Sequence, residues 1–207
     1  MTYDNIHCKF LPQGEIRRIA DQFRNDYWPE KTLPVDMERI IEGRLKLDII
    51  PEHICLPDPF LKNDLSGIVV NFDQYMDSSD RYLNRLRFSF AHEIGHLTLH
   101  HHVYEMLEFS REEEYLKFME QLPEEEYGSF EWQANEFAGC LLVPVDKLTD
   151  EIEKIYLDIK GNNQLDLLKR FPDDILSRVS RKMSVPFGVS SAVIEKRVVR
   201  DNLWPPK

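Results

Sequence analysis

The chain has 207 residues, with 26 Lys or Arg against 37 Asp or Glu, so its formal net charge at pH 7 is −11. Its length suffices for one sizeable core, and 42% hydrophobic with 30% charged residues excludes wholesale disorder. No apolar run approaches the roughly 18 residues that cross a bilayer, so no membrane span is expected. The three cysteines are widely spaced and include no CxxC pair, and the first residues lack the pattern of a secretory signal. Both features predict a cytoplasmic protein.

Hydrophobic periodicity and turn residues divide the first part of the chain into two helices and two short strands. The predicted elements are a helix over 14–28, a helix over 34–45, a strand over 47–50, a proline-rich loop over 51–64 and a strand over 66–72. Pro34 is placed at the start of the second helix, where its missing amide hydrogen costs no hydrogen bond. Pro51 is placed at the end of the first strand.

The rest of the chain is predicted to be helical. The predicted helices run from the capping residues 77–80 to about 101, over 111–121 and 130–142, from Pro144 to about 159, and over 172–183 and 189–200. An acidic loop around Pro123 is expected between the helices 111–121 and 130–142. Gly161-Asn162-Asn163 marks a boundary between a domain over 1–160 and a helical extension over 161–207. The predicted fold class is α+β, helix-rich with a small β-sheet.

The acidic residues are concentrated in the middle of the chain. The stretch 105–160 holds 16 Asp or Glu against 5 Lys or Arg, which equals the acidic excess of the whole chain. Because an acidic surface repels phosphate, direct nucleic-acid binding is not expected of the main body. The stretch favours either a basic protein partner or simply solubility.

The strongest chemical signal is the motif HEIGH, His92 to His96, inside the long helix. Its two histidines project from one helix face, about 40° apart, which suits two nitrogen ligands of one Zn²⁺. Glu93 is rotated away from that line, so it can act on a zinc-bound water instead of on the metal. Apolar residues line both sides of this helix and predict its burial. The small sheet is expected next to it.

A third ligand has to come from outside the motif. His102 has the spacing of a longer metalloprotease motif, but that motif needs glycine at position 99, where Leu99 stands. His100 lies one turn further along the same helix, and a straight helix cannot wrap three such ligands around one ion. We therefore expect His100 to lie either beside a ligand or in solvent.

The helix over 130–142 supplies the remaining candidates. Glu131 lies next to its apolar stripe, and Asn135, one turn further, could hydrogen-bond a ligand imidazole. Glu136 is the alternative ligand, because an error of one residue in the helix rotation would exchange the faces. A donor to the oxyanion of a reacting carbonyl is also expected, with Tyr127, Arg87 and the histidines at 100–102 as candidates.

Several segments in a fixed order resemble one known family. They are the segments 34–40, 67–71, 87–100, 131–138, 141–144 and 185–203. Together they are similar to the ImmA/IrrE family of bacterial and phage zinc metallopeptidases, and the resemblance extends over residues 34–203. This ordered set of segments identifies a family more specifically than the HExxH motif alone.

The resemblance implies a thermolysin-like zinc site in a metallopeptidase domain over 1–160, with His92, His96 and Glu131 as ligands and Glu93 as the base. Members of this family are associated with cleavage of helix-turn-helix repressors in phage or mobile-element induction and in stress responses. The implied protein is a zinc-dependent endopeptidase with a repressor as its protein substrate. The alternative is a metal-stabilised regulatory module that binds a repressor without cutting it.

The strand over 66–72 has two interpretations. It could lie beside the cleft and pair with an extended substrate by strand addition. It could equally be an ordinary core strand, because its residues are apolar and β-branched.

Overall fold

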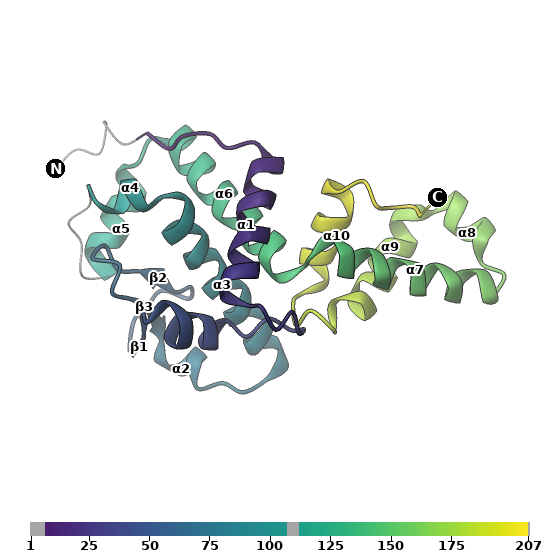
Figure 1. The fold of residues 1–207 in the computed structure, drawn as a ribbon, viewed down its shortest axis with the longest axis horizontal. Helices are drawn as coiled ribbons and strands as arrows, with labels where there is room; N and C mark the ends of the chain where they lie inside the picture. The colour runs from purple at the N-terminus through teal and green to yellow at the C-terminus, as the bar shows by residue number, and fades with distance from the viewer. Residues whose placement is uncertain (1–6, 107–111, 207) are drawn as a thin grey trace. The chain divides into compact units, whose positions relative to one another are not determined.

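The structure is a computed structural model that describes residues 7–106 and 112–206. These residues form two compact units, the first built from residues up to Lys31 and from Asp36–Leu141, the second from Thr32–Val35 and from Leu142 onward. The first unit contains the HEIGH helix and a three-stranded sheet, which confirms the predicted helix-rich α+β class (Figure 1). The predicted domain boundary at 160/161 lies inside the second unit and stays a prediction.

The first unit consists of one sheet and the helices around it. Its helices are α1 (Gln13–Tyr27), η1 (Arg39–Leu45), α2 (Phe72–Tyr75), α3 (Asp80–Leu99), α4 (His101–Tyr104), α5 (Glu112–Gln121) and α6 (Glu124–Leu142, ending at the start of the second unit). Its strands are β1 (Asp48–Glu52), β2 (Phe60–Leu61) and β3 (Gly67–Asn71). Helix α3 carries the motif and contacts β2, which places the sheet next to the motif as predicted.

The sheet has the strand order β1-β3-β2, so β3 is the central strand. Strand β1 is parallel to β3 along its whole length, and β2 is antiparallel to it, with Leu61 opposite Ile68. Because β3 is flanked on both sides, the hypothesis that it pairs with an extended substrate is wrong. The alternative, a buried core strand, fits its burial from Gly67 to Val70.

Two predictions about the region before α3 need correction. The strand that was expected to end at Pro51 continues through it to Glu52, because β1 is an edge strand where a missing amide hydrogen is tolerated. The segment 51–64, predicted to be a loop, contains the two-residue strand β2. This short strand matters for the site, because it brings a backbone amide to the motif helix.

The second helix does not begin at Pro34. Helical structure starts after Asp36, whose carboxylate accepts a hydrogen bond from the backbone amide of Arg39. An aspartate that caps the first amides is a stronger start signal than the preceding proline. The last residues of the segment then form η1, a π-helix.

Helix α6 begins at Glu124, well before the predicted residue 130. Its first turn is Glu124, Glu125 and Glu126, and carboxylates are favourable at the positive end of a helix dipole. The acidic stretch that predicted a loop therefore starts a helix. The predicted beginning of the preceding helix at Arg111 lies outside the described residues, and α5 is described from Glu112.

Helices α3 and α6 approach each other closely at Gly95. A Cβ atom at this position would lie 3.0 Å from both the Cα and the carbonyl oxygen of Ala134, and 3.3 Å from the ring of Phe137. Phe137 in turn contacts Phe23 of α1 edge to face, with ring centroids 5.6 Å apart. The glycine inside the motif thus allows the helix that carries Glu131 to lie against the motif helix.

We expect Gly95→Ala to destabilise the protein by about 1–3 kcal/mol, the usual cost of overpacking a close contact. The matched control is Gly128→Ala in α6, where a Cβ would meet no atom within 4 Å. Since alanine favours helix by up to about 1 kcal/mol over glycine, the control should be stabilised. Urea unfolding of both variants measures the difference, and equal midpoints would contradict the close approach.

All the regular secondary structure in the described residues of the second unit is helical. Its helices are α7 (Val145–Gly161), α8 (Leu165–Arg170), α9 (Pro172–Ser184) and α10 (Ser191–Arg200). Helix α7 buries Leu148, Ile152, Ile155 and Ile159, the stripe expected of a helix with one apolar face. The two predicted C-terminal helices are present as α9 and α10.

Candidate metal centre

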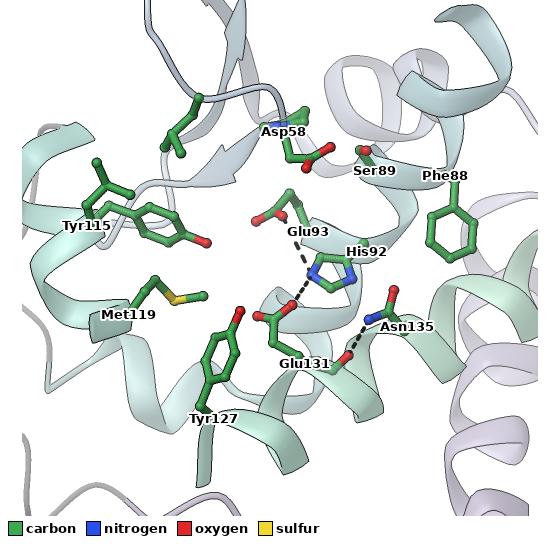
Figure 2. A pocket seen from close by; sticks show the side chains of 13 residues that line it. Asp58, Phe88, Ser89, His92, Glu93, Tyr115, Met119, Tyr127, Glu131 and Asn135 are labelled. Carbon is green, nitrogen blue, oxygen red and sulfur yellow. Dashed lines mark hydrogen bonds and ion pairs between the residues drawn. The ribbon is translucent and has the colours of Figure 1, made fainter. Parts of the chain in front are cut away.

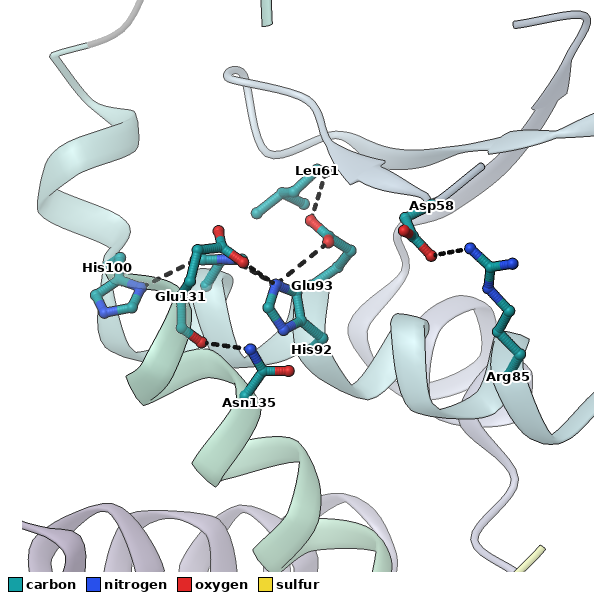
Figure 3. A network of polar contacts seen from close by, with 9 residues as sticks. Asp58, Leu61, Arg85, His92, Glu93, His100, Glu131 and Asn135 are labelled. Carbon is teal, nitrogen blue, oxygen red and sulfur yellow. Dashed lines mark hydrogen bonds and ion pairs between the residues drawn. The ribbon is translucent and has the colours of Figure 1, made fainter. Parts of the chain in front are cut away.

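The two motif histidines and one glutamate from α6 converge at one point. The Nε2 atoms of His92 and His96 lie 2.9 Å apart, and the Glu131 carboxylate oxygens lie 3.3 Å from the first and 3.4 Å from the second (Figure 3). Ligands around a tetrahedral zinc, with bonds of about 2.0–2.1 Å, are about 3.3 Å from one another. These three side chains, called the His–His–Glu cluster below, could therefore hold a metal ion.

The charge states of His96 and Glu131 suit a divalent cation. Burial alone would raise the pKa of Glu131, but its hydrogen bonds and ion pairs with both histidines hold that pKa well below its usual range. Burial, assisted by the neighbouring His92, lowers the pKa of His96 to about 4. At neutral pH, His96 is therefore neutral and Glu131 ionised, which are the forms that bind zinc.

Glu93 lies next to the cluster and is only 3% exposed. Its Oε2 accepts a hydrogen bond of 2.8 Å from the backbone amide of Leu61 in β2, and its Oε1 lies 4.0 Å from His92 Nε2. Burial, with a contribution from the charge of Glu131, raises the pKa of Glu93 to about 8. A nearby cation would favour the carboxylate and lower this pKa, which would keep Glu93 in the form that accepts a proton.

The structure separates the two glutamates that the sequence left open. Glu136 is fully buried, and its Oε1 lies 3.3 Å from Gln13 Nε2 and 3.7 Å from Cys140 Sγ, away from the cluster. Glu131, five residues earlier in α6, faces the histidines. Glu131 and not Glu136 therefore lies where a third ligand has to be.

Asn135 lies beside the cluster, as predicted. Its side-chain amide donates to the Glu131 carbonyl oxygen at 2.8 Å. Although burial disfavours a charged His92, hydrogen bonds to Glu131 and Asn135 and the charges of Glu93 and Glu131 raise the pKa of His92. Asn135 is thus placed to orient an imidazole of the cluster.

The three histidines after the motif have different surroundings. His101 is exposed and pairs with Glu105 at 3.3 Å, and His102 is also exposed. His100 is only 1% exposed, and its Nδ1 lies 3.0 Å from the Nδ1 of His96. Of the two positions that the sequence allowed for His100, the structure places it beside a ligand candidate.

A cleft of about 390 Å³ opens over His92, Glu93 and Glu131 (Figure 2). Two tyrosines, Tyr115 of α5 and Tyr127 of α6, bring phenolic hydroxyls to its wall. Of the predicted oxyanion donors, Tyr127 therefore faces the cleft, whereas Arg87 donates to Asn84 Oδ1 at 3.1 Å.

Sequence reasoning missed two contributors to the site. Tyr115 lies in the acidic helix between the motif and Glu131, and only the helical spacing of its aromatic neighbours would have pointed to it. The amide of Leu61 has no signal of its own in the sequence, because every residue type except proline supplies the same donor.

A buried HExxH helix, with a carboxylate contributed by a separate helix, is the arrangement typical of zinc metallopeptidases. The comparison with known families agrees, since residues 78–198 match the IrrE N-terminal-like domain of peptidase family M78. The chain therefore belongs to this family, the ImmA/IrrE metallopeptidases, which confirms the resemblance found in the sequence. No curated protein matches the chain. Within the described residues, no helix is long and apolar enough to cross a membrane.

Proposed function

We propose that the protein is a zinc-dependent endopeptidase in which His92, His96 and Glu131 hold the ion and Glu93 is the general base. The observation that carries this proposal is the convergence of three ligand atoms beside a buried carboxylate. Two imidazoles and one carboxylate are the ligand set of catalytic zinc sites, which leave one position open. Zinc is favoured over Mn²⁺ because two of the three ligands are imidazoles.

The position of Glu93 suits proton transfer. One of its oxygens is fixed by the Leu61 amide, and the other is free to face the cleft on the His92 side. When bound, Zn²⁺ would supply a Lewis acid that polarises the peptide carbonyl and acidifies a water molecule. Glu93 would take a proton from the attacking water and deliver it to the leaving amine. The hydroxyl of Tyr127, at the wall of the same cleft, would donate to the carbonyl oxygen.

We infer that the protein substrate is a basic one, a helix-turn-helix repressor. Six glutamates occupy the first turns of α5 and α6, two of the helices that line the cleft: Glu112, Glu113, Glu114, Glu124, Glu125 and Glu126. Such a surface attracts a DNA-binding protein and repels DNA itself. A module that only binds a repressor would have no need of the buried Glu93, which argues against the non-catalytic alternative.

The proposal predicts cleavage that depends on the metal. Purified protein, loaded with Zn²⁺, is incubated with the repressor encoded beside its gene, and the products are identified by mass spectrometry. We expect discrete fragments, their loss after removal of the metal by a chelator, and their return when Zn²⁺ is added back. An intact repressor that nevertheless co-purifies with the protein would support the binding module instead.

A further inference from the structure

The two ring nitrogens of His96 have different neighbours. Its Nε2 faces the cluster, 2.9 Å from His92 Nε2 and 3.4 Å from Glu131, whereas its Nδ1 lies 3.0 Å from the Nδ1 of His100. A neutral imidazole carries one proton, and the nitrogen that binds a metal has to be the unprotonated one. If Nε2 is the ligand, the proton of His96 is on Nδ1 and is donated to His100.

His100 is held in the position that this hydrogen bond requires. It ends α3 as the C-cap residue, and its backbone amide donates to the His96 carbonyl oxygen at 2.9 Å. The ring of Phe130 stacks on both imidazoles, with centroid distances of 4.1 Å to His96 and 4.3 Å to His100. The two rings are therefore fixed by backbone geometry and by a shared aromatic neighbour.

The acceptor role of His100 determines where its own proton is. Because its Nδ1 accepts, its proton is on Nε2, which is buried. The Nε2 of Gln133 lies 3.0 Å from both the Lys9 carbonyl oxygen and Ser129 Oγ, which fixes the orientation of this amide. Its Oε1 is buried as well, and among the described residues neither Oε1 nor the Nε2 of His100 makes a hydrogen bond of good geometry with another group.

These two atoms complement each other, one a donor and one an acceptor. Burial and the neighbouring His96 lower the pKa of His100 and keep this imidazole neutral, although the nearby Gln133 amide opposes them in part, as an acceptor does. The hydrogen bond of the histidine pair thus runs from His96 Nδ1–H to His100 Nδ1, and the Oε1 of Gln133 would suit the Nε2–H of His100 as an acceptor.

We propose that His100 is a positioning residue of the metal site, which fixes the tautomer of His96 so that its Nε2 is presented to the ion. The inference rests on the proposed role of His96 as a ligand. The group that accepts a hydrogen bond from a metal-binding histidine is usually a carboxylate or a carbonyl oxygen. Here the acceptor would be a neutral imidazole.

The test compares His100→Asn with His100→Leu in the full-length protein. The two replacements have nearly the same shape, but only asparagine has a side-chain oxygen where the Nδ1 of His100 lies. We expect the zinc affinity, measured by competition with a chromophoric chelator, to fall about 10–100-fold in His100→Leu, which is the usual cost of losing such a partner. Asparagine should restore most of that loss.

If His100 only fills the core, the apolar leucine should bind zinc as tightly as wild type, and that result would overturn the proposal. Equal losses in both variants would overturn it too. Nitrogen-15 NMR of the metal-free protein gives a second readout. In wild type and in His100→Asn, the proton of His96 should be on Nδ1. In His100→Leu, the two tautomers of His96, with the proton on Nδ1 or on Nε2, should exchange with each other.

The measurements separate this inference from the proposed peptidase. A protein that binds zinc with the predicted order of affinities, yet cleaves no repressor, would leave the role of His100 intact. A wild-type protein that binds no zinc would refute the proposed function. The NMR measurement of the His96 tautomer would then still show whether His100 positions the His96 ring.

Discussion

Replacement of Glu93 by glutamine should lower the rate of peptide hydrolysis by at least about 100-fold, the usual contribution of a general base, while leaving zinc bound. Glutamine has nearly the shape of glutamate, and its carbonyl oxygen can still accept the hydrogen bond from the Leu61 amide. Its amide nitrogen cannot take a proton from water. The variant should therefore fold normally, bind zinc within a few-fold of wild type and fail at the chemical step.

The matched control is Glu15→Gln, an exposed glutamate in the first turn of α1. It removes the same charge without touching the cleft, so its kcat should stay close to that of wild type. Both rates are measured with zinc-loaded protein and a saturating substrate, so that binding effects of the lost charge do not enter. Hydrolysis by Glu93→Gln at the wild-type rate would remove Glu93 from the mechanism.

The convergence of the cluster was predictable because it depends on local periodicity. His92 and His96 share a face as a direct result of helix geometry, and the apolar stripe of α6 fixes its rotation. That stripe directs Glu136 toward Gln13 and Cys140 and leaves Glu131 on the side of the motif helix. Family membership and helix content followed from the same short-range patterns.

The contributions that could not be predicted depend on which elements are neighbours. The composition of β3 says that it is buried, but not that β1 and β2 occupy both of its sides, so substrate pairing remained open until the strand order was known. The Leu61 amide reaches Glu93 only because two residues of a proline-rich segment pair with β3. His100 is buried because Phe130, distant in sequence, stacks on it.

The close approach at Gly95 depends both on a local feature of the sequence and on a contact between two distant helices. A glycine inside HExxH has no role in coordination, and the sequence alone gives no reason for it. In the structure, the backbone of Ala134 occupies the space where a side chain would be, and Glu131 lies one turn before Ala134 on the same helix. The residue between the two motif histidines therefore helps to set how near Glu131 comes to them.

Substitution of the third ligand should separate the two glutamates of α6. We expect Glu131→Gln to weaken zinc binding by more than about 100-fold, because a charged ligand is lost and even an outer hydrogen-bond partner is worth about 10–100-fold. Glu136→Gln should change the affinity only a few-fold, since its side chain contacts Gln13 and Cys140 instead of the cluster. The same charge is removed from the same helix in both variants.

Zinc-dependent stabilisation provides the measurement, because a ligand that binds only the folded state raises the melting temperature more, the more tightly it binds. Added Zn²⁺ should raise the melting temperature of wild type and of Glu136→Gln, and should have little effect on Glu131→Gln. Each variant is compared with its own metal-free form, so that a loss of intrinsic stability from replacing the buried Glu136 does not affect the result. Stabilisation of Glu131→Gln to the wild-type extent would show that the ion is held by other groups, and loss of stabilisation in Glu136→Gln alone would reassign the third ligand.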